Sequence, residues 1–301
     1  MRGRLALLLL GALGTGCARG DAADAAASDS ALLAAREARL VQSLQDTTQA
    51  GSQGPVALWK LPEKLNEISG MVVTPNGRLL AHGDERGKIF EIDYRRGRIT
   101  GEFTLGSPPV HGDFESITRI GNLLLLFTSD GLLYRFRQGA DGASVAYEKY
   151  DTDLGSKCEF EGMAYDSTAS QLLFACKKTH DKDLKGNVVI FRATVGANGS
   201  LEGQSLVPML IPVDRVIGAN KWDDFSPSDI TVDPASGNYV LLSSLEKGIV
   251  EITPAGDVVF SRPLPPNHPQ PEGIAITGDH ILIISDEAKG SQARLTLYRW
   301  P

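Results

Sequence analysis

The stretch CEFEGMAYD, residues 158–166, decides the fold because its pattern recurs along the chain. It combines the start of a buried strand with two acidic side chains. Four other segments repeat it: EISGMVVT from Glu67, DFESITRI from Asp113, SPSDITVD from Ser226 and QPEGIAIT from Gln270. The five segments align on a Met or Ile. The residues two positions before it form one column: Ser69, Glu115, Glu161, Ser228 and Glu272. The steps of 46, 46, 67 and 44 residues indicate a propeller or another repeat array.

Each repeat reads as four antiparallel strands. A turn follows the motif, then come an apolar strand such as LLLLFTSD, a glycine turn and a third strand such as NVVIFRA, and a fourth strand closes most units. The last unit ends at LTLYRWP and lacks its outer strand, which PVALWKLP at residues 55–62 can supply. We therefore predict an all-β, five-bladed propeller over residues 55–301, closed by pairing its two ends. The long third step predicts an insertion around DRVIGANKWDDF, since no strand pattern there supports a sixth blade.

The first residues have the layout of an export signal. Arg2 and Arg4 precede a short apolar run, and the segment ends in LGTGC at Cys17. We interpret residues 1–17 as a lipoprotein-type signal peptide with Cys17 as the lipidated residue, ordinary export with nearby cleavage being the alternative. Residues 18–54, rich in Ala, Asp and Ser, are expected to be a flexible linker with a short helix. This predicts a lipoprotein of the cell envelope, in the outer rather than the inner membrane.

Composition and the remaining cysteines set further limits. With 301 residues, 42% of them hydrophobic, the chain can form a full core. Its net charge of −7 opposes binding to nucleic acid. Cys158 and Cys176 fall in one predicted hairpin, so an oxidising compartment allows a disulfide whose formation depends on their geometry.

The acids of the repeat are the candidate functional residues. Glu115, Glu161 and Glu272 share one column, and a second column two residues earlier contains Glu67, Asp113 and Glu159. Because alternate residues of a strand share a face, we expect two rings around the channel. Crowded carboxylates raise one another's pKa unless a cation lies between them, and an all-oxygen ligand set suits Ca²⁺. Alternatively, these acids accept backbone hydrogen bonds and serve the fold alone.

The motifs EISGM, GDFESI, EFEGMAYD, SPSDITVD, QPEGIAI and ISDE resemble those of the SdiA-regulated (YjiK-like) bacterial family. This resemblance covers residues 55–301 and implies a five-bladed propeller, distantly related to NHL-type propellers, with a calcium site. By motif position it carries that site onto Glu115, Glu161 and Glu272, with Glu67 and Glu159 as second choices. Ser69 and Ser228 interrupt the acid ring. The resemblance implies no reaction.

Three functional hypotheses follow. The first is a calcium-binding propeller that binds a protein or small molecule at one face and performs no catalysis. The second is a calcium-dependent hydrolase acting on a lactone, phosphoester or sugar. The third is a metal-free scaffold. The absence of a G-x-S-x-G elbow and of a Ser-His-Asp arrangement favours binding over catalysis.

Overall fold

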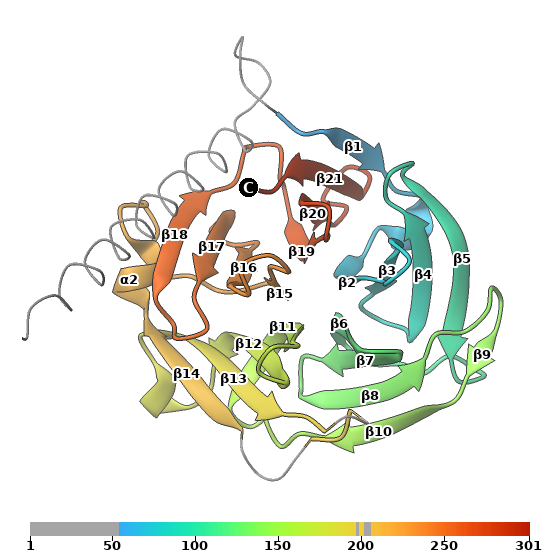
Figure 1. Ribbon diagram of the computed structural model, residues 1–301, viewed down its shortest axis with the longest axis horizontal. Coiled ribbons are helices and arrows are strands. Elements are labelled where there is room, and N and C mark those ends of the chain that lie inside the picture. Colours follow the sequence, from blue (N-terminus) through green and yellow to red (C-terminus); the bar gives the residue numbers. More distant parts are fainter. Residues whose placement is uncertain (1–53, 197–198, 202–205) are drawn as a thin grey trace, which may run out of the picture.

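Five β-sheets stand around a central channel in the computed structural model, which describes residues 54–196, 199–201 and 206–301 (Figure 1). This arrangement is the five-bladed propeller that the sequence predicts. The predicted signal peptide with Cys17, and the predicted linker up to residue 53, lie outside the described residues. Among the described residues, no helix has both the length and the apolar character that a membrane span requires.

The blades follow one another along the chain, each beginning with its innermost strand. The first contains β2 (Ile68–Val73), β3 (Leu79–Gly83), β4 (Lys88–Asp93) and β5 (Arg98–Leu105). The second contains β6 (Phe114–Ile120), β7 (Leu123–Thr128), β8 (Leu132–Arg137) and β10 (Tyr147–Asp151). The third contains β11 (Cys158–Asp166), β12 (Gln171–Thr179), β13 (Asn187–Thr194) and β14 (Val207–Pro212). The fourth contains β15 (Asp229–Val232), β16 (Tyr239–Ser243), β17 (Gly248–Ile252) and β18 (Val258–Pro263). The fifth contains β19 (Pro271–Ile276), β20 (Ile281–Asp286), β21 (Arg294–Arg299) and β1 (Ala57–Lys60). We call the face where the inner strands begin the upper face, and the face where they end the lower face.

The ring closes through the N-terminal strand, as predicted. β1 pairs antiparallel with β21, in a register that runs from Ala57 opposite Leu297 to Lys60 opposite Arg294. The fifth blade is therefore built from both ends of the propeller domain. Because β1 covers the outer side of β21, the last strand of the chain is not an open sheet edge.

The hydrophobic core is divided into five layers, one between each pair of neighbouring blades. In the layer between the second and third blades, the rings of Phe127 and Phe160 lie 5.6 Å apart. A middle strand of a blade is covered on both faces by such layers. This explains why β7 reads LLLLFT and β16 reads YVLLS, without the polar–apolar alternation of a half-exposed strand.

The long third step of the repeat contains an insertion, not a sixth blade. Between β14 and β15 the chain forms the short helix α2 (Val213–Ile217), which contacts β14 and β18 at the rim (Figure 1). Two 3₁₀ turns, η1 (Glu63–Leu65) and η2 (Lys182–Leu184), lie in other connections. One departure from four strands per blade was not predicted: β9 (Ser144–Val145) pairs in parallel with β5 and extends the first sheet.

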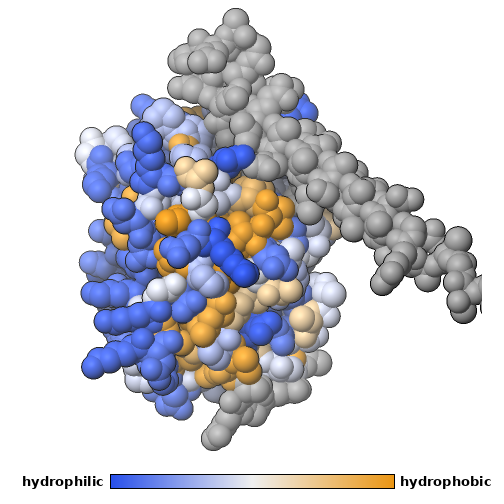
Figure 2. Space-filling model, turned by 90° about the vertical axis from the view of Figure 1, so that its left-hand side faces the viewer, coloured by the Kyte–Doolittle hydropathy of each residue, from blue (hydrophilic) through white to orange (hydrophobic). Residues whose placement is uncertain are grey.

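The outer surface near α2 combines hydrophobic and hydrophilic residues. Figure 2 shows hydrophobic groups reaching the surface on this side of the ring, where β14 exposes Val207 and Leu210.

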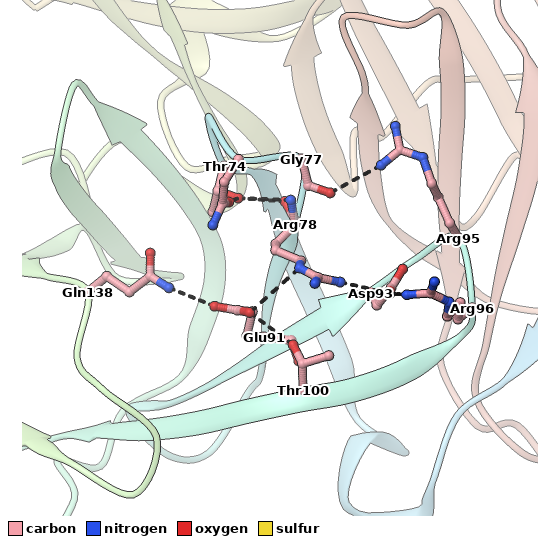
Figure 3. Close-up of polar contacts among 10 residues, drawn as sticks. Thr74, Gly77, Arg78, Glu91, Asp93, Arg95, Arg96, Thr100 and Gln138 are labelled. Carbon is pink, nitrogen blue, oxygen red and sulfur yellow. Dashed lines mark hydrogen bonds and ion pairs between the residues drawn. The ribbon is translucent and has the colours of Figure 1, made fainter.

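Charged turns tie the lower ends of the first blade together (Figure 3). The Asp93 carboxylate accepts hydrogen bonds from Arg78 at 2.8 Å and from Arg96 at 2.9 Å. Arg95 lies 2.7 Å from Asp279 of the fifth blade. Because the arginine side chains are partly exposed, these pairs orient the turns more than they stabilise the fold.

Glycines allow the inner strands to approach one another at the axis. A Cβ atom added to Gly162 would lie 2.8 Å from the Ile230 nitrogen and 2.9 Å from the Asp229 Cα. At Gly70 it would lie 2.7 Å from the Ser116 Cα, and at Gly273 it would lie 2.5 Å from the Ser69 carbonyl oxygen. The inner strands are thus in backbone contact across the blade boundaries, where there is no room for a side chain.

We expect Gly162→Ala to lower the free energy of unfolding by about 1–3 kcal/mol, because the added methyl group forces two blades apart at the axis. Gly278→Ala is the matched control, since a Cβ there meets nothing within 4 Å, and its effect should stay within about 0.5 kcal/mol. Urea unfolding followed by circular dichroism measures both. Equal stability of the two variants would contradict the close approach at Gly162.

Candidate functional site: an acidic channel mouth

The three glutamates of the main column lie on β-bulges. Phe160 pairs with Cys176 and Gly162 pairs with Ala175, so Glu161 is an extra residue without a partner on β12. The same shift leaves Glu115 unpaired between Phe114 and Ser116, and Glu272 unpaired between Pro271 and Gly273. A bulge interrupts the alternation of side chains and redirects the extra residue. The expected simple alternation therefore fails here, and Glu159 and Glu161 are separated by the irregularity.

The channel is filled just below these glutamates by Ser116 and Asp229. Asp229 Oδ1 accepts a hydrogen bond from its neighbour Ile230 N at 2.8 Å, and Oδ2 accepts one from Ile274 N of the fifth blade at 2.8 Å. Ser116 Oγ lies 3.3 Å from Asp229 Oδ1 and accepts a hydrogen bond from Met163 N of the third blade at 2.9 Å. Both side chains are buried. They satisfy amide groups on the inner edges of three sheets, which would otherwise be unpaired at the axis.

Lys177 on β12 is the positive group that meets the acid column. Its Nζ donates a hydrogen bond to Glu161 Oε1, and its charge also acts on Glu115 and Glu272. Burial lowers the pKa of Lys177, but the bond and the charge of Glu161 outweigh this and raise the pKa overall. The lysine is therefore a stable cation in the channel mouth.

The carboxyl groups around Lys177 hold their protons unusually well. Burial and the charge of Glu161 raise the pKa of Glu115 to about 9. Burial also raises the pKa of Glu161, to about 7, although the hydrogen bond from Lys177 opposes it. Burial raises the pKa of Glu272 against the hydrogen bond from Ser244 Oγ, which is 3.0 Å long. One lysine does not compensate three acids, of which Glu161 is buried and Glu115 and Glu272 are half-buried.

An outer group of acids surrounds this centre. The charge of Asp84 raises the pKa of Glu67, and burial raises the pKa of Asp84 and of Glu287. Asp113 accepts a hydrogen bond from Ser129 Oγ. Mutual electrostatic effects link nine acids with Lys177: Glu67, Asp84, Glu85, Asp113, Glu115, Glu159, Glu161, Glu272 and Glu287. We call these ten residues the acidic mouth.

The predicted calcium ligands Glu115, Glu161 and Glu272 lie around Lys177 in this arrangement. Among the described residues, no three His, Cys, Asp or Glu side chains are grouped as ligands of one metal ion. The ammonium group of Lys177 also bonds to Glu161, which is one of the expected ligands. The donor chemistry suits a hard cation, but the observed counter-charge is an amine. Calcium binding therefore stays a prediction of the sequence.

A groove of about 820 Å³ opens beside the acidic mouth between the third and fourth blades. Its wall on the third blade includes Lys177, Lys178 and Lys185, and its opposite wall includes Asp223 and Asp224. Cys176 also lines the groove and forms a disulfide with Cys158, joining the first residue of β11 to the second half of β12. The bridge holds together the two strands that carry Glu161 and Lys177.

Two central residues were absent from our sequence prediction. Lys177 lies on the second strand of its blade, outside the aligned motif. Asp229 occupies the column of Gly70, Ser116, Gly162 and Gly273. A charged residue in a column of small ones was a signal that could have identified it.

Comparisons with known proteins define the fold and leave the function open. No family model matches the chain, and no curated protein sequence matches it. Among solved structures, PQQ-bound aldose sugar dehydrogenase from Streptomyces coelicolor is similar at a TM-score of 0.54 and 15% identity, covering 81% of this chain and 98% of that one. Glutaminyl cyclase from Myxococcus xanthus is similar at a TM-score of 0.52 and 14% identity, covering 81% and 94%. At these identities the likeness concerns the propeller fold alone.

We expect the melting temperature to fall as the pH rises from 6 to 9.5. A carboxyl group whose pKa is higher in the folded than in the unfolded chain stabilises the fold when protonated. That stabilisation is complete below the unfolded value of about 4.3 and is lost as the pH passes about 7 for Glu161 and about 9 for Glu115. Differential scanning calorimetry of the wild type and Glu115→Gln checks this, and the variant should show a smaller fall. Asp257→Asn, an exposed acid on the lower face, should behave like the wild type. A constant or rising melting temperature would refute the raised pKa values.

Asp229→Ala should destabilise the protein more than Asp229→Asn. Alanine leaves the amides of Ile230 and Ile274 without an acceptor, at a cost of about 1–3 kcal/mol for each buried donor. Asparagine retains one side-chain acceptor and carries no charge. Urea unfolding at pH 7 should therefore rank the wild type first, Asn second and Ala last, because Asn leaves one of the two amides without an acceptor and Ala leaves both. Similar losses for both variants would show that the hydrogen bonds at the axis contribute little.

Proposed function

We propose that this chain is a binding protein whose acidic mouth takes up the positively charged group of a small organic ligand, while the adjoining groove holds the rest of that ligand. The excess of acid carries the proposal: Lys177 interacts with Glu115, Glu161 and Glu272, and six further carboxyl groups of the acidic mouth interact with one another or with these three. A second cation would favour the ionised form of Glu115, Glu161 and Glu272, whose pKa values are raised by burial and by neighbouring acids. Lys177 on Glu161 illustrates that an ammonium group suits these acids.

Two further observations support a ligand in this position. Oδ1 of Asp84 is buried and has no hydrogen-bond partner among the described residues, so it can accept one from a ligand. The groove volume of about 820 Å³ lies within the usual range for small-molecule sites, about 300–1,000 Å³. Its floor includes the buried ring of Phe225, and Leu245, 68% exposed, stands at its edge. An amine with an apolar or dipolar body matches this combination.

The cellular setting is part of the proposal. The N-terminal layout of residues 1–17 supports an exported lipoprotein anchored through Cys17, which would hold the propeller in the cell envelope, in the outer membrane rather than the inner. The motif resemblance to the SdiA-regulated family supports an envelope propeller of this kind. A ligand or partner would then be met outside the cytoplasm.

General acid–base catalysis is a second candidate, in line with the hydrolase alternative. The pKa of about 9 at Glu115 and of about 7 at Glu161 lets one group donate a proton and its neighbour accept one near neutral pH. Mass spectrometry of a bound amine after prolonged incubation distinguishes the candidates, because recovery of the unchanged amine supports binding alone.

Isothermal titration with spermidine, and separately with CaCl₂, tests the binding proposal at constant ionic strength. Spermidine should bind saturably to the wild type, and Glu115→Gln and Glu272→Gln should each weaken binding at least tenfold, because a bound cation favours loss of the proton from each carboxyl group and pairs with the carboxylate, which glutamine cannot form. Asp257→Asn removes one negative charge far from the acidic mouth and should leave spermidine binding unchanged. If Asp257→Asn weakens binding as much as the two glutamate variants do, spermidine is attracted by the net charge of the protein and not by the acidic mouth. Tight binding of CaCl₂ with no binding of spermidine would favour the calcium site and overturn the amine proposal.

A further inference from the structure

The lower end of the channel is a separate cavity with chemistry opposite to that of the acidic mouth. Ser116 and Asp229 fill the channel between the two ends. Below them lies a cavity of about 250 Å³, and all five inner strands contribute to its walls. The apolar lining residues are Met71, Val72, Val73, Ile117, Met163, Ala164, Ile230, Val232, Ala275 and Ile276. Within the part of the chain that the structure describes, no acidic side chain lines it.

One arginine lies on this cavity, and a second lies in the hollow beside it. Arg119 lines the cavity and also lines an adjoining hollow of about 300 Å³, to which Arg137, Gln138 and Asn122 contribute. Neither arginine forms an ion pair with an acid of the described chain, whereas Arg78, Arg95 and Arg96 on the same face do. The lower mouth therefore presents uncompensated positive charge directly beside an apolar funnel.

Arg119 is held in position by the fold. Its Nε donates to the Val73 carbonyl at 2.9 Å, and one Nη donates to the Gly121 carbonyl at 3.1 Å. Burial lowers the pKa of Arg119, as expected for a guanidinium that is partly removed from water without an anion beside it. The second Nη group takes no part in these two bonds. A guanidinium oriented in this way can recognise a carboxylate.

We infer that the lower cavity binds a small aliphatic carboxylate, with its hydrocarbon chain between the inner strands and its carboxylate at Arg119 and Arg137. The volume sets the length of the chain. At about 30 Å³ for each group of water size, a cavity of about 250 Å³ accommodates roughly eight carbon atoms. Octanoate is therefore a suitable probe. This site is independent of the acidic mouth, so either proposal can fail without the other.

The methionines allow a direct test in the full-length protein. The chain has 4 methionines, of which Met71 and Met163 line the cavity and Met209 lies on β14 in another layer. In a protein labelled with ¹³C-methyl methionine, octanoate should shift the NMR signals of Met71 and Met163 saturably and leave Met209 in place. Absence of a shift at Met71 and Met163, or an equal shift at Met209, would overturn the proposal.

Matched ligands and variants test the recognition of the carboxylate. Octan-1-ol and octylamine should bind at least tenfold more weakly than octanoate, since both lack the anion. Arg119→Gln should weaken octanoate binding at least tenfold and Arg137→Gln at least threefold, whereas Arg98→Gln, a charge lost from an exposed position outside the cavity, should not change it. Thr231→Trp, which fills the cavity, should abolish the shifts. Because Arg119 also binds two carbonyl groups, Arg137→Gln decides the matter if Arg119→Gln fails to fold. Equal binding of octanoate and octan-1-ol, or binding unchanged in both Arg137→Gln and Thr231→Trp, would refute the site.

Discussion

The backbone contact of the inner strands at the axis is the constraint on which the rest of this propeller depends. Each blade presents the free edge of its inner strand to the channel, and buried amide groups there need acceptors. Gly70, Gly162 and Gly273 bring the edges close together, and Ser116 and Asp229 provide oxygen atoms to the amides of Met163, Ile230 and Ile274. A fully buried carboxyl group at this point is costly, but it accepts hydrogen bonds from two blades. The blades are thus joined by polar bonds at the axis and by apolar layers farther out.

This closure divides the channel into two compartments. Above Asp229, bulges direct Glu115, Glu161 and Glu272 toward Lys177. Below it, the same strands continue with regular pairing and present Met, Ile and Val side chains. The same inner strands therefore present acids at their start and apolar side chains farther along, because the bulge affects only their first residues. The acid excess above and the unpaired arginines below give the two mouths opposite charge preferences.

The sequence predicted the architecture well because its signals were local and repeated. The motif at 158–166 located all five inner strands, and PVALWKLP was recognised as the closing strand that pairs with β21. The prediction that Glu115, Glu161 and Glu272 share one environment agrees with their mutual electrostatic effects. Lys177 escaped prediction because its contact with Glu161 joins two strands across an irregular register, which strand periodicity cannot express. The bulges escaped for the same reason: an extra residue changes the direction of a side chain without changing the apolar pattern.

The counter-charge within this acidic mouth is an ammonium group. A divalent ion draws several carboxylates to one point, whereas an ammonium group on a flexible stem binds one of them and leaves its neighbours partly protonated. The latter describes Glu161 with Lys177, and Glu115 with its raised pKa. Such a cluster disfavours the folded state near neutral pH, and a fold retains that cost most readily where it serves binding or catalysis. The buried Ser116–Asp229 pair holds the blades together immediately below the repelling charges. The repulsion therefore does not separate the blades.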